Sequence, residues 1–227
     1  MIVHEILETE NHPVYKALEV ANGNRQYDFL QSAVKVALEL GRPFLSSAVI
    51  KALNYHAIAC LHTHAGEYRP CPVKVGQDAD AYMPPAHYRV AALTEDFINT
   101  VNRAWEKSDP VALAAFVLWR LNHIHPFING NGRTARAACY FVVCAKAGSL
   151  LPGTTILPEL LRRERDRYVA ALKQADNSVG KGALDLTELH TLINELLEEQ
   201  VTGVNPNAPA ASGGSAAPPG PPVLPAP

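Results

Sequence analysis

One stretch, HPFINGNGRTAR, runs from His125 to Arg136 and decides how the rest of the chain is interpreted. It lies between two strongly apolar segments with helical spacing, so we expect a loop that leads into a helix. Pro126 disfavours helical geometry at the residue before it, which places the His125 imidazole at the end of one helix. The two glycines beside Asn131 permit positive φ and a close approach of a ligand to the backbone. Free N–H groups at the start of the next helix then predict an anion site.

Arg133 and Arg136 fall in the first turn of that next helix, three residues apart and on one face. Cations at a helix N-terminus oppose the macrodipole by roughly 0.3 to 1 kcal/mol each. Two guanidinium groups there therefore indicate a bound polyanion, and each can bind phosphate oxygens through a fork of two hydrogen bonds. Together with His125 at the edge, the pattern predicts phosphate handling by a general base.

The segments on either side of the loop carry apolar residues at three- and four-residue spacing, which predicts a mostly α protein. Pro110 is suited to a helix start and Gly148 to a helix end. The expected helices are Tyr27 to Leu40, Leu45 to His62, Tyr88 to Lys107, Val111 to Leu121, Arg133 to Lys146, Pro158 to Gln174 and Asp185 to Val201.

An exception to the helical pattern lies between Tyr68 and Met83. Two short apolar pieces, Val73 to Val75 and Ala81 to Met83, flank a polar stretch that contains Gly76. This pattern predicts a β-hairpin or an extended flap.

The composition is that of an ordinary soluble globular protein: 227 residues, 48% hydrophobic, with a formal net charge of -2. A chain without a global basic field is not expected to bind nucleic acid or a membrane surface as its main function. No apolar run approaches the roughly 20 residues of a transmembrane helix. The N-terminus, MIVHEILETENH, lacks the features of a secretory signal, so we expect a cytoplasmic protein.

The last part of the chain, residues 203 to 227, is rich in proline, glycine and alanine and has no charged residue. Such a segment cannot bury a core and is expected to be disordered. We therefore expect one folded domain over residues 1–202, with a core of about residues 25–200, followed by a disordered tail.

The chain has four cysteines, Cys60, Cys71, Cys139 and Cys144. They lack paired CxxC spacing, so we interpret them as reduced and mostly buried thiols. A zinc site in CLHTH is the alternative, because Cys60 and His64 are four residues apart, whereas His62 would point away. Core thiols and surface histidines are the interpretation we favour over that alternative. His123 and His125 also form an HxH pair, but no acidic ligand lies near them in the sequence.

The stretch HPFINGNGRTAR resembles the motif of the Fic (filamentation induced by cAMP) family: His-Pro-Phe, any residue, Asp or Glu, Gly-Asn-Gly-Arg, two residues, Arg. Eight of the nine specified positions match. The resemblance extends to AGEYR, with Gly66, Tyr68 and Arg69, and to RDRYVAAL, with Arg165, Tyr168 and Leu172. It covers most of residues 25–200.

The resemblance implies an all-α, Fic-like helical bundle with a β-hairpin flap over the active site. It also implies a protein adenylyltransferase, which moves AMP from ATP to a Ser, Thr or Tyr hydroxyl of a target protein. His125 would deprotonate that hydroxyl, and Phe127 would pack into the core and fix the loop. The flap would hold the target segment by strand addition. The implied flap residues are Val73, Lys74, Val75, Gly76 and Tyr82.

The resemblance also implies the nucleotide-binding residues. Arg133 and Arg136 would neutralise the β and γ phosphates, while Tyr168 and Asp176 lie where the family places nucleotide contacts. The residues that would cradle the phosphates are Gly130, Asn131 and Gly132.

One position departs from the motif, because the chain has Asn129 where the family has an acidic residue that holds Mg²⁺. Mg²⁺ prefers anionic oxygen, so a neutral amide should weaken the metal site. Two alternatives to efficient AMP transfer therefore stay open: a catalytically weak nucleotide-binding regulator, or a transferase with another phosphate-containing donor. A structural or partner-binding module that uses the tail is a third.

Many Fic enzymes are restrained by a helix with Ser or Thr, three residues, then Glu followed by Gly or Asn. Glu10 is followed by Asn11, but Ile6 occupies the Ser/Thr position. Thr191 and Glu195 keep the spacing but lead into a leucine. Control by a separate antitoxin-like protein is therefore open, as is no such control.

Overall fold

The computed structural model describes residues 1–41, 44–76 and 81–203, and nine α-helices lie in this part of the chain. A short 3₁₀-helix, η1 (His87–Arg89), leads into α4. The α-helices are α1 (Val3–Leu7), α2 (Pro13–Glu39), α3 (Ser47–Ile58), α4 (Val90–Ala104), α5 (Pro110–Ile124), α6 (Asn131–Ala147), α7 (Leu157–Arg163), α8 (Arg165–Gly180) and α9 (Thr187–Thr202). The mostly α prediction is confirmed.

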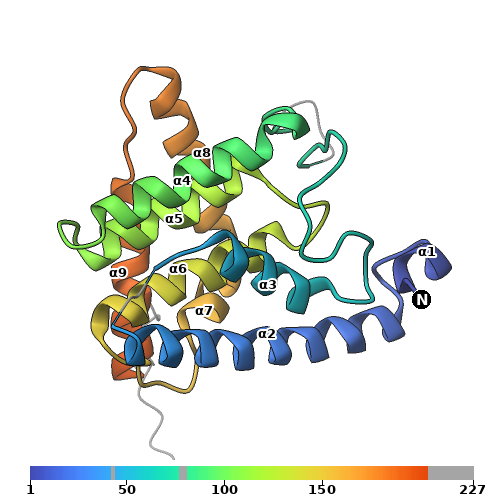
Figure 1. The fold of residues 1–227 in the computed structure, drawn as a ribbon, viewed down its shortest axis with the longest axis horizontal. Coiled ribbons are helices and arrows are strands. Elements are labelled where there is room, and N and C mark those ends of the chain that lie inside the picture. Colours follow the sequence, from blue (N-terminus) through green and yellow to red (C-terminus); the bar gives the residue numbers. More distant parts are fainter. Residues whose placement is uncertain (42–43, 77–80, 204–227) are drawn as a thin grey trace, which may run out of the picture.

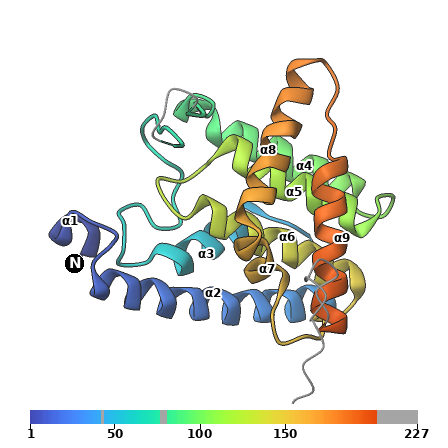
Figure 2. The same cartoon turned by 180° about the vertical axis from the view of Figure 1, so that it is seen from behind.

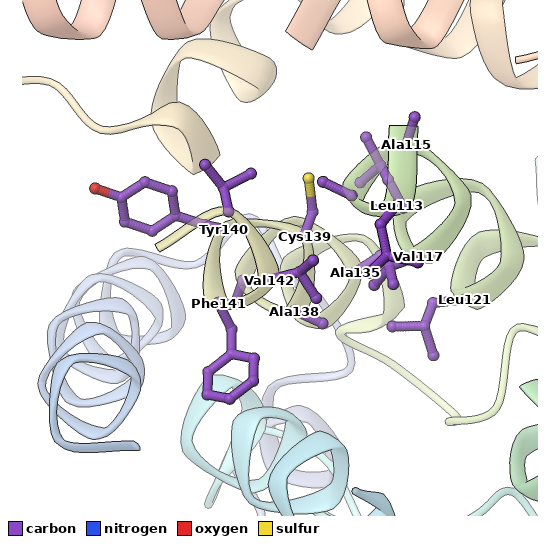
Figure 3. Packing of buried hydrophobic residues seen from close by; sticks show 14 of the residues in the cluster. Leu113, Ala115, Val117, Leu121, Ala135, Ala138, Cys139, Tyr140, Phe141 and Val142 are labelled. Carbon is purple, nitrogen blue, oxygen red and sulfur yellow. The ribbon is translucent and has the colours of Figure 1, made fainter. Parts of the chain in front are cut away.

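Helix α6 forms the centre of the bundle, as the two opposite views in Figures 1 and 2 show. It packs most extensively against α5 and also contacts α2, α3 and α7. From Ala135 to Ala145 every residue except Arg136 is buried, which is expected of a helix that is apolar nearly all round and covered by neighbours. Ala135 and Ala138 are small, which allows a close approach of α5 (Figure 3). The motif loop therefore joins the two helices that share the largest interface in the fold.

Helix α2 begins fourteen residues before the predicted helix at Tyr27. Its first half was missed because polar side chains, Asn22 and Gln26, occupy the core-facing stripe there. Asn22 donates to the Ala59 carbonyl at 2.9 Å, and Gln26 donates to the Leu53 carbonyl at 2.9 Å. The amides thus satisfy carbonyl groups at the end of α3 where an apolar residue could not. Periodicity of apolar residues cannot detect such a face.

Other boundaries differ from the sequence prediction in smaller ways. The predicted helix from Pro158 to Gln174 is divided at Glu164, whose ψ of 35° is not helical, into α7 and α8. The short helix α1 was not predicted. It is held by contacts with the segment after α3, where Val3 N donates to Cys60 O at 2.8 Å and His4 N to Leu61 O at 3.0 Å.

The predicted β-hairpin flap is not confirmed. Among the described residues, the flap has one isolated antiparallel bridge, between Val75 and Tyr82, with both N–H groups donating across it at 3.0 Å. Residues 77–80, between these two, lie outside the described residues. The extended flap is the form of the prediction that the bridge fits.

Three further expectations concern the rest of the chain. The tail from residue 204 onward lies outside the described residues, so its predicted disorder stays a prediction. No helix within the described ranges is long and apolar enough to cross a membrane. The cysteines are free thiols, but only Cys139 and Cys144 are buried, while Cys60 and Cys71 are exposed.

Candidate functional site

The motif loop begins where α5 ends. His125 caps that helix in a left-handed conformation, with φ 51° and its N–H bonded to Leu121 O at 3.0 Å. The left-handed geometry is uncommon for a residue other than glycine, and it turns the chain sharply into Pro126. His125 thus lies at the end of a helix, as expected from Pro126, and it lines the adjoining cavity.

The His125 side chain is set up to accept a proton. The pKa of His125 is lowered to about 4, mainly by burial and to a smaller extent by the charge of Arg69, while the hydrogen bond to Asn122 acts in the opposite direction. At neutral pH the ring is therefore uncharged. Nδ1 lies 3.4 Å from the Asn122 carbonyl oxygen, so a proton on Nδ1 points there and leaves Nε2 as the free acceptor.

The loop is braced from inside by Asn131. Its side-chain oxygen accepts from Phe127 N at 2.9 Å, and its side-chain amide donates to Phe127 O at 2.8 Å. Phe127 itself has no exposed surface and packs 5.9 Å from the Tyr68 ring, measured between ring centroids. Because its side chain is used internally, Asn131 can offer a phosphate only its backbone.

Gly130 is the residue whose conformation the loop requires. Its φ is 75°, and a Cβ there would lie 2.6 Å from Ile58 Cγ2 and 3.1 Å from Asn54 Nδ2. No side chain fits at this position, so only glycine allows the loop to pack this closely against α3. The helix α6 starts at the next residue, and the first backbone N–H groups of a helix have no partner within it.

Asn54 on α3 is a residue that the sequence reasoning missed. It is fully buried and bonds on both sides: its amide donates to Asn129 O at 2.9 Å and Thr134 Oγ1 at 3.3 Å, and its oxygen accepts from Gly66 N at 3.0 Å. Asn54 thereby fixes the loop relative to the segment that carries AGEYR. The signal available in the sequence was an asparagine on the apolar face of a helical stretch, ALNYHAIA, between Ile50, Leu53, Ala57 and Ile58.

Arg69 links the flap to the motif loop. Its side chain is 2% exposed and donates to three carbonyl oxygens: His125 O at 2.8 Å, Cys71 O at 3.1 Å, and Pro85 O. Its backbone N–H also donates to Pro126 O at 2.9 Å. One guanidinium thus joins both ends of the flap to the backbone of the histidine.

A cavity of about 860 Å³ opens beside the loop. This volume is in the range of small-molecule sites. The cavity is lined by α2, the motif loop, the start of α6 and residues 153–162, so it includes His125 and the predicted phosphate-binding segment. The basic residues on its wall are Arg133, Arg136 and Arg162, and the acidic ones are Glu19 and Glu159.

Arg136 is the cation best placed to receive an anion. Burial lowers its pKa, and Arg133 and Arg162 oppose its charge while Tyr168 and Glu159 favour it. Within the described ranges its guanidinium has no hydrogen bond or ion pair, and Nη1 would lie 3.2 Å from a Cβ built on Gly132. A half-buried cation without a counter-ion, folded over a glycine loop, is favourable when an anion is bound.

Arg133 and Asn129 are already engaged. Arg133 donates to Ala57 O at 3.1 Å and to Asn129 Oδ1 at 3.0 Å, and its Nη1 lies 3.3 Å from Glu19 Oε1. The Asn129 amide donates to Glu10 Oε1 at 3.1 Å. A neutral oxygen that already accepts from a guanidinium is a poor ligand for Mg²⁺, so the donor set at residue 129 does not fit that ion.

The two other predicted nucleotide contacts, Tyr168 and Asp176, do not line the cavity. Tyr168 is buried beneath it, where its hydroxyl accepts from Asn122 Nδ2 at 2.6 Å. Asp176 Oδ1 instead accepts from Trp119 Nε1 at 2.9 Å and lies 2.8 Å from His123 Nδ1. Asp176 therefore belongs to a cluster on the flap side of α5.

Tyr82 is the flap residue that joins that cluster. Its hydroxyl donates to His123 O at 2.8 Å, and its ring lies 5.7 Å from the His123 ring. Burial raises the pKa of Tyr82, and Asp176 raises it further. Lys74 and Gly76 are exposed beside the Val75–Tyr82 bridge, and Val73 is half-buried. The predicted flap residues thus lie on the two sides of the Val75–Tyr82 bridge, and Tyr82 fixes the second side to α5.

Among the described residues, neither metal site that the sequence suggested as an alternative, CLHTH with Cys71 or the HxH pair, has its side chains grouped together. Within the described part of the chain, the grouped metal-ligating side chains are His4, Glu10 and His62, so His62 is not grouped with Cys60, His64 or Cys71. In the HxH pair, His123 faces Asp176 while His125 faces the cavity.

Comparisons with known proteins agree with this geometry. The sequence model of the Fic/DOC family matches residues 44–143. Proteins named protein adenylyltransferase Fic match over 153 residues, 62% of this chain: that of Drosophila willistoni is 28% identical and that of Drosophila ananassae is 42% identical. The chain spans only 28% and 29% of the length of those two relatives.

Solved structures show the same fold. A Fic domain containing signaling protein from Bacteroides thetaiotaomicron superimposes with a TM-score of 0.66 and 22% identity, covering 88% of this chain and 74% of that one. Fic-1 from C. elegans gives a TM-score of 0.64 and 20% identity, covering 87% of this chain and 54% of that one. The matched segment holds the whole motif loop together with the residues that brace it, and the chain therefore carries a domain of the Fic/DOC family.

Proposed function

We propose that this protein is a protein adenylyltransferase that transfers AMP from ATP to a Ser, Thr or Tyr hydroxyl of a target protein. The observation that carries the proposal is the neutral His125 ring at the edge of a cavity on whose wall the Arg136 cation has no described counter-ion. The name of the relatives, protein adenylyltransferase, agrees with it.

The phosphates would lie at the start of α6. The backbone N–H groups of Asn131 and Gly132 face the anion, and Arg136 adds a charge-assisted donor. Arg133 supports the same region but shares its charge with Glu19. Val20, Ile156 and Pro158 line the same cavity and offer apolar contact to a nucleobase.

The transfer step follows from the position of the base. His125 Nε2 takes the proton of the target hydroxyl as its oxygen attacks the α-phosphorus of ATP. The bond from the α-phosphorus to the oxygen bridging to the β-phosphorus breaks, and pyrophosphate leaves with that electron pair. Arg136 and the helix N-terminus stabilise the charge that develops on the leaving group. The imidazolium then returns its proton to solvent or pyrophosphate.

The target would be held by the flap. The chain beside Val75 and Tyr82 forms an antiparallel bridge, and an incoming strand can pair with such an edge. Tyr82 and Arg69 fix this segment to the backbone of α5 and the motif loop, so the bound hydroxyl is held near His125.

A second function, a nucleotide-binding regulator with weak transfer, is favoured by the arrangement at Asn129. Its oxygen is occupied by Arg133, and the donor set there does not fit Mg²⁺. Such a protein would bind ATP in the same cavity without modifying a target.

One experiment separates these possibilities. The purified chain is incubated with a cell lysate and ATP labelled either on the α- or the γ-phosphorus, and binding of ATP is measured in parallel. Label from α-phosphorus alone supports AMP transfer, and label from γ-phosphorus alone indicates phosphoryl transfer. ATP binding without labelled protein supports the regulator, and no ATP binding contradicts both functions.

A further inference from the structure

The N-terminal segment brings His4 and Glu10, from the first ten residues, beside His62, which follows α3. Helix α1 is fastened to the chain after α3 by the hydrogen bonds from Val3 and His4 to Cys60 and Leu61. This contact places His4, Glu10 and His62 beside one another, and one ligand atom from each lies within 4.8 Å of the other two. The cluster stands next to the motif loop but contributes nothing to the cavity wall.

Two oxygen atoms compete for one nitrogen of His62, and a bound cation would remove this competition. His62 is 9% exposed, and its Nε2 lies 2.8 Å from Tyr15 Oη and 3.2 Å from Glu10 Oε1. A single ring nitrogen serves both oxygens poorly: with a proton it donates well to only one, and without a proton its lone pair faces a carboxylate. A positive ion between Nε2 and Oε1 removes that conflict.

The His4 ring completes the set. It lies 4.6 Å from the His62 ring between centroids, with an interplanar angle of 30°. Two imidazoles and one carboxylate are a donor set that binds Zn²⁺ and leaves one position open to water. Glu10 is exposed and lies in the short connection between α1 and α2. Its side chain can therefore change rotamer and bring its carboxylate within bonding distance of an ion held by the two histidines.

We propose that His4, Glu10 and His62 form a Zn²⁺ site that fastens the N-terminal segment to the end of α3, beside residue 129. Glu10 Oε1 also accepts from Asn129 Nδ2 at 3.1 Å, so an ion bound by that oxygen is coupled to the motif loop. Tyr15 Oη lies 2.8 Å from the same His62 nitrogen, so an ion bound at Nε2 would take the place of that hydrogen bond. The site does not depend on the proposed transfer reaction.

The sequence alone suggests a different set of metal ligands, in which His62 is grouped with Cys60, His64 and Cys71. The fold separates those residues and supplies His62 with partners from the first ten residues of the chain. His64 instead contacts Glu67, with Nδ1 3.2 Å from Oε2. His64 is therefore a suitable control, two residues from the proposed ligand and outside the cluster.

The test uses the untagged full chain after treatment with EDTA. Zn²⁺ is titrated by calorimetry without nucleotide, and Co²⁺ is added separately to record its visible absorption bands. We expect one ion per chain, and a rise in melting temperature of about 5 °C or more at 100-fold excess over the dissociation constant. His4→Ala and Glu10→Gln should each weaken binding by more than about 10-fold, whereas His64→Ala should not.

His62→Ala does not serve as a test, because His62 is buried and its replacement could abolish binding by misfolding the protein. Glu10→Gln, at an exposed residue, and His4→Ala, at a half-buried one, keep the proposal falsifiable. Failure of the chain to bind Zn²⁺, or binding unchanged in both variants, overturns it. Loss of binding in His64→Ala equal to that in His4→Ala also overturns it, because the ion would then be held by CLHTH. Since no nucleotide is present, these outcomes leave the proposed transfer reaction untouched.

Discussion

Replacing Arg69 by Met should separate the flap from the catalytic loop. The methionine keeps an apolar stem but removes the donors to His125 O, Cys71 O and Pro85 O. Hydrogen bonds from a charged donor contribute about 1.5 to 3 kcal/mol each. Cys71 is exposed, so water can replace part of the loss there, and relief of the buried charge offsets more. We therefore expect the free energy of unfolding to fall by about 2 to 4 kcal/mol.

Arg69→Met should affect target modification much more than ATP binding. Arg69 does not line the nucleotide cavity, so ATP affinity should stay within about 3-fold, which corresponds to less than 1 kcal/mol. In the proposed mechanism the flap holds the target, so kcat/KM for the protein target should fall by at least about 10-fold when the hydroxyl is no longer held beside His125.

Urea unfolding, ATP titration and target labelling measure these three quantities. Arg89→Met is the matched control, because Arg89 is an exposed arginine at the end of η1 and its loss should change the unfolding free energy by no more than about 0.5 kcal/mol. If Arg69→Met and Arg89→Met unfold at the same urea concentration and label equally well, Arg69 does not join the flap to the loop.

Three other predictions concern the cavity. Because burial holds the pKa of His125 near 4, kcat/KM should stay level from pH 8 to about 5 and fall only as the base becomes protonated below that, so an acid limb near 6.5 contradicts its buried setting. Arg136→Ala should weaken ATP binding by about 10-fold or more, while the melting temperature without ATP holds or rises, because a cation that opposes the helix dipole is removed. A marked fall in that melting temperature would show Arg136 to be structural. Asn129→Asp should strengthen the Mg²⁺ dependence of transfer and weaken ATP binding in EDTA, whereas equal ATP affinities for parent and variant with and without Mg²⁺ would show that residue 129 does not face a metal.

The elements best predicted from the sequence are those with one apolar face or a clear boundary residue. Helices α5 and α6 were predicted within three residues of their observed ends, because Pro110 and Gly148 mark them and their cores are apolar. The first half of α2 was missed because Asn22 and Gln26 face the core and pair with carbonyl groups of α3. Those partners are set by tertiary packing, which a local pattern does not contain.

The features of the candidate site also divide into those that follow from local sequence and those that depend on long-range contacts. The position of His125 at the end of α5 follows from Pro126, and α6 begins at Asn131, two residues before the expected start at Arg133. The roles of Asn54 and Arg69 depend on contacts across more than fifty residues, so no local spacing reveals them. Asp176 was placed near the nucleotide by resemblance, whereas its carboxylate faces Trp119 and His123.

The most direct test of the account is the transfer of α-labelled AMP to target protein by His125→Ala, with ATP binding measured on the same preparation. His190→Ala is the control, since that histidine lies on α9 away from the cavity. Loss of the general base should reduce labelling by about 10²- to 10⁴-fold while ATP affinity changes little, and the control should label normally. Near-normal labelling by His125→Ala would contradict the assignment of His125 as the base.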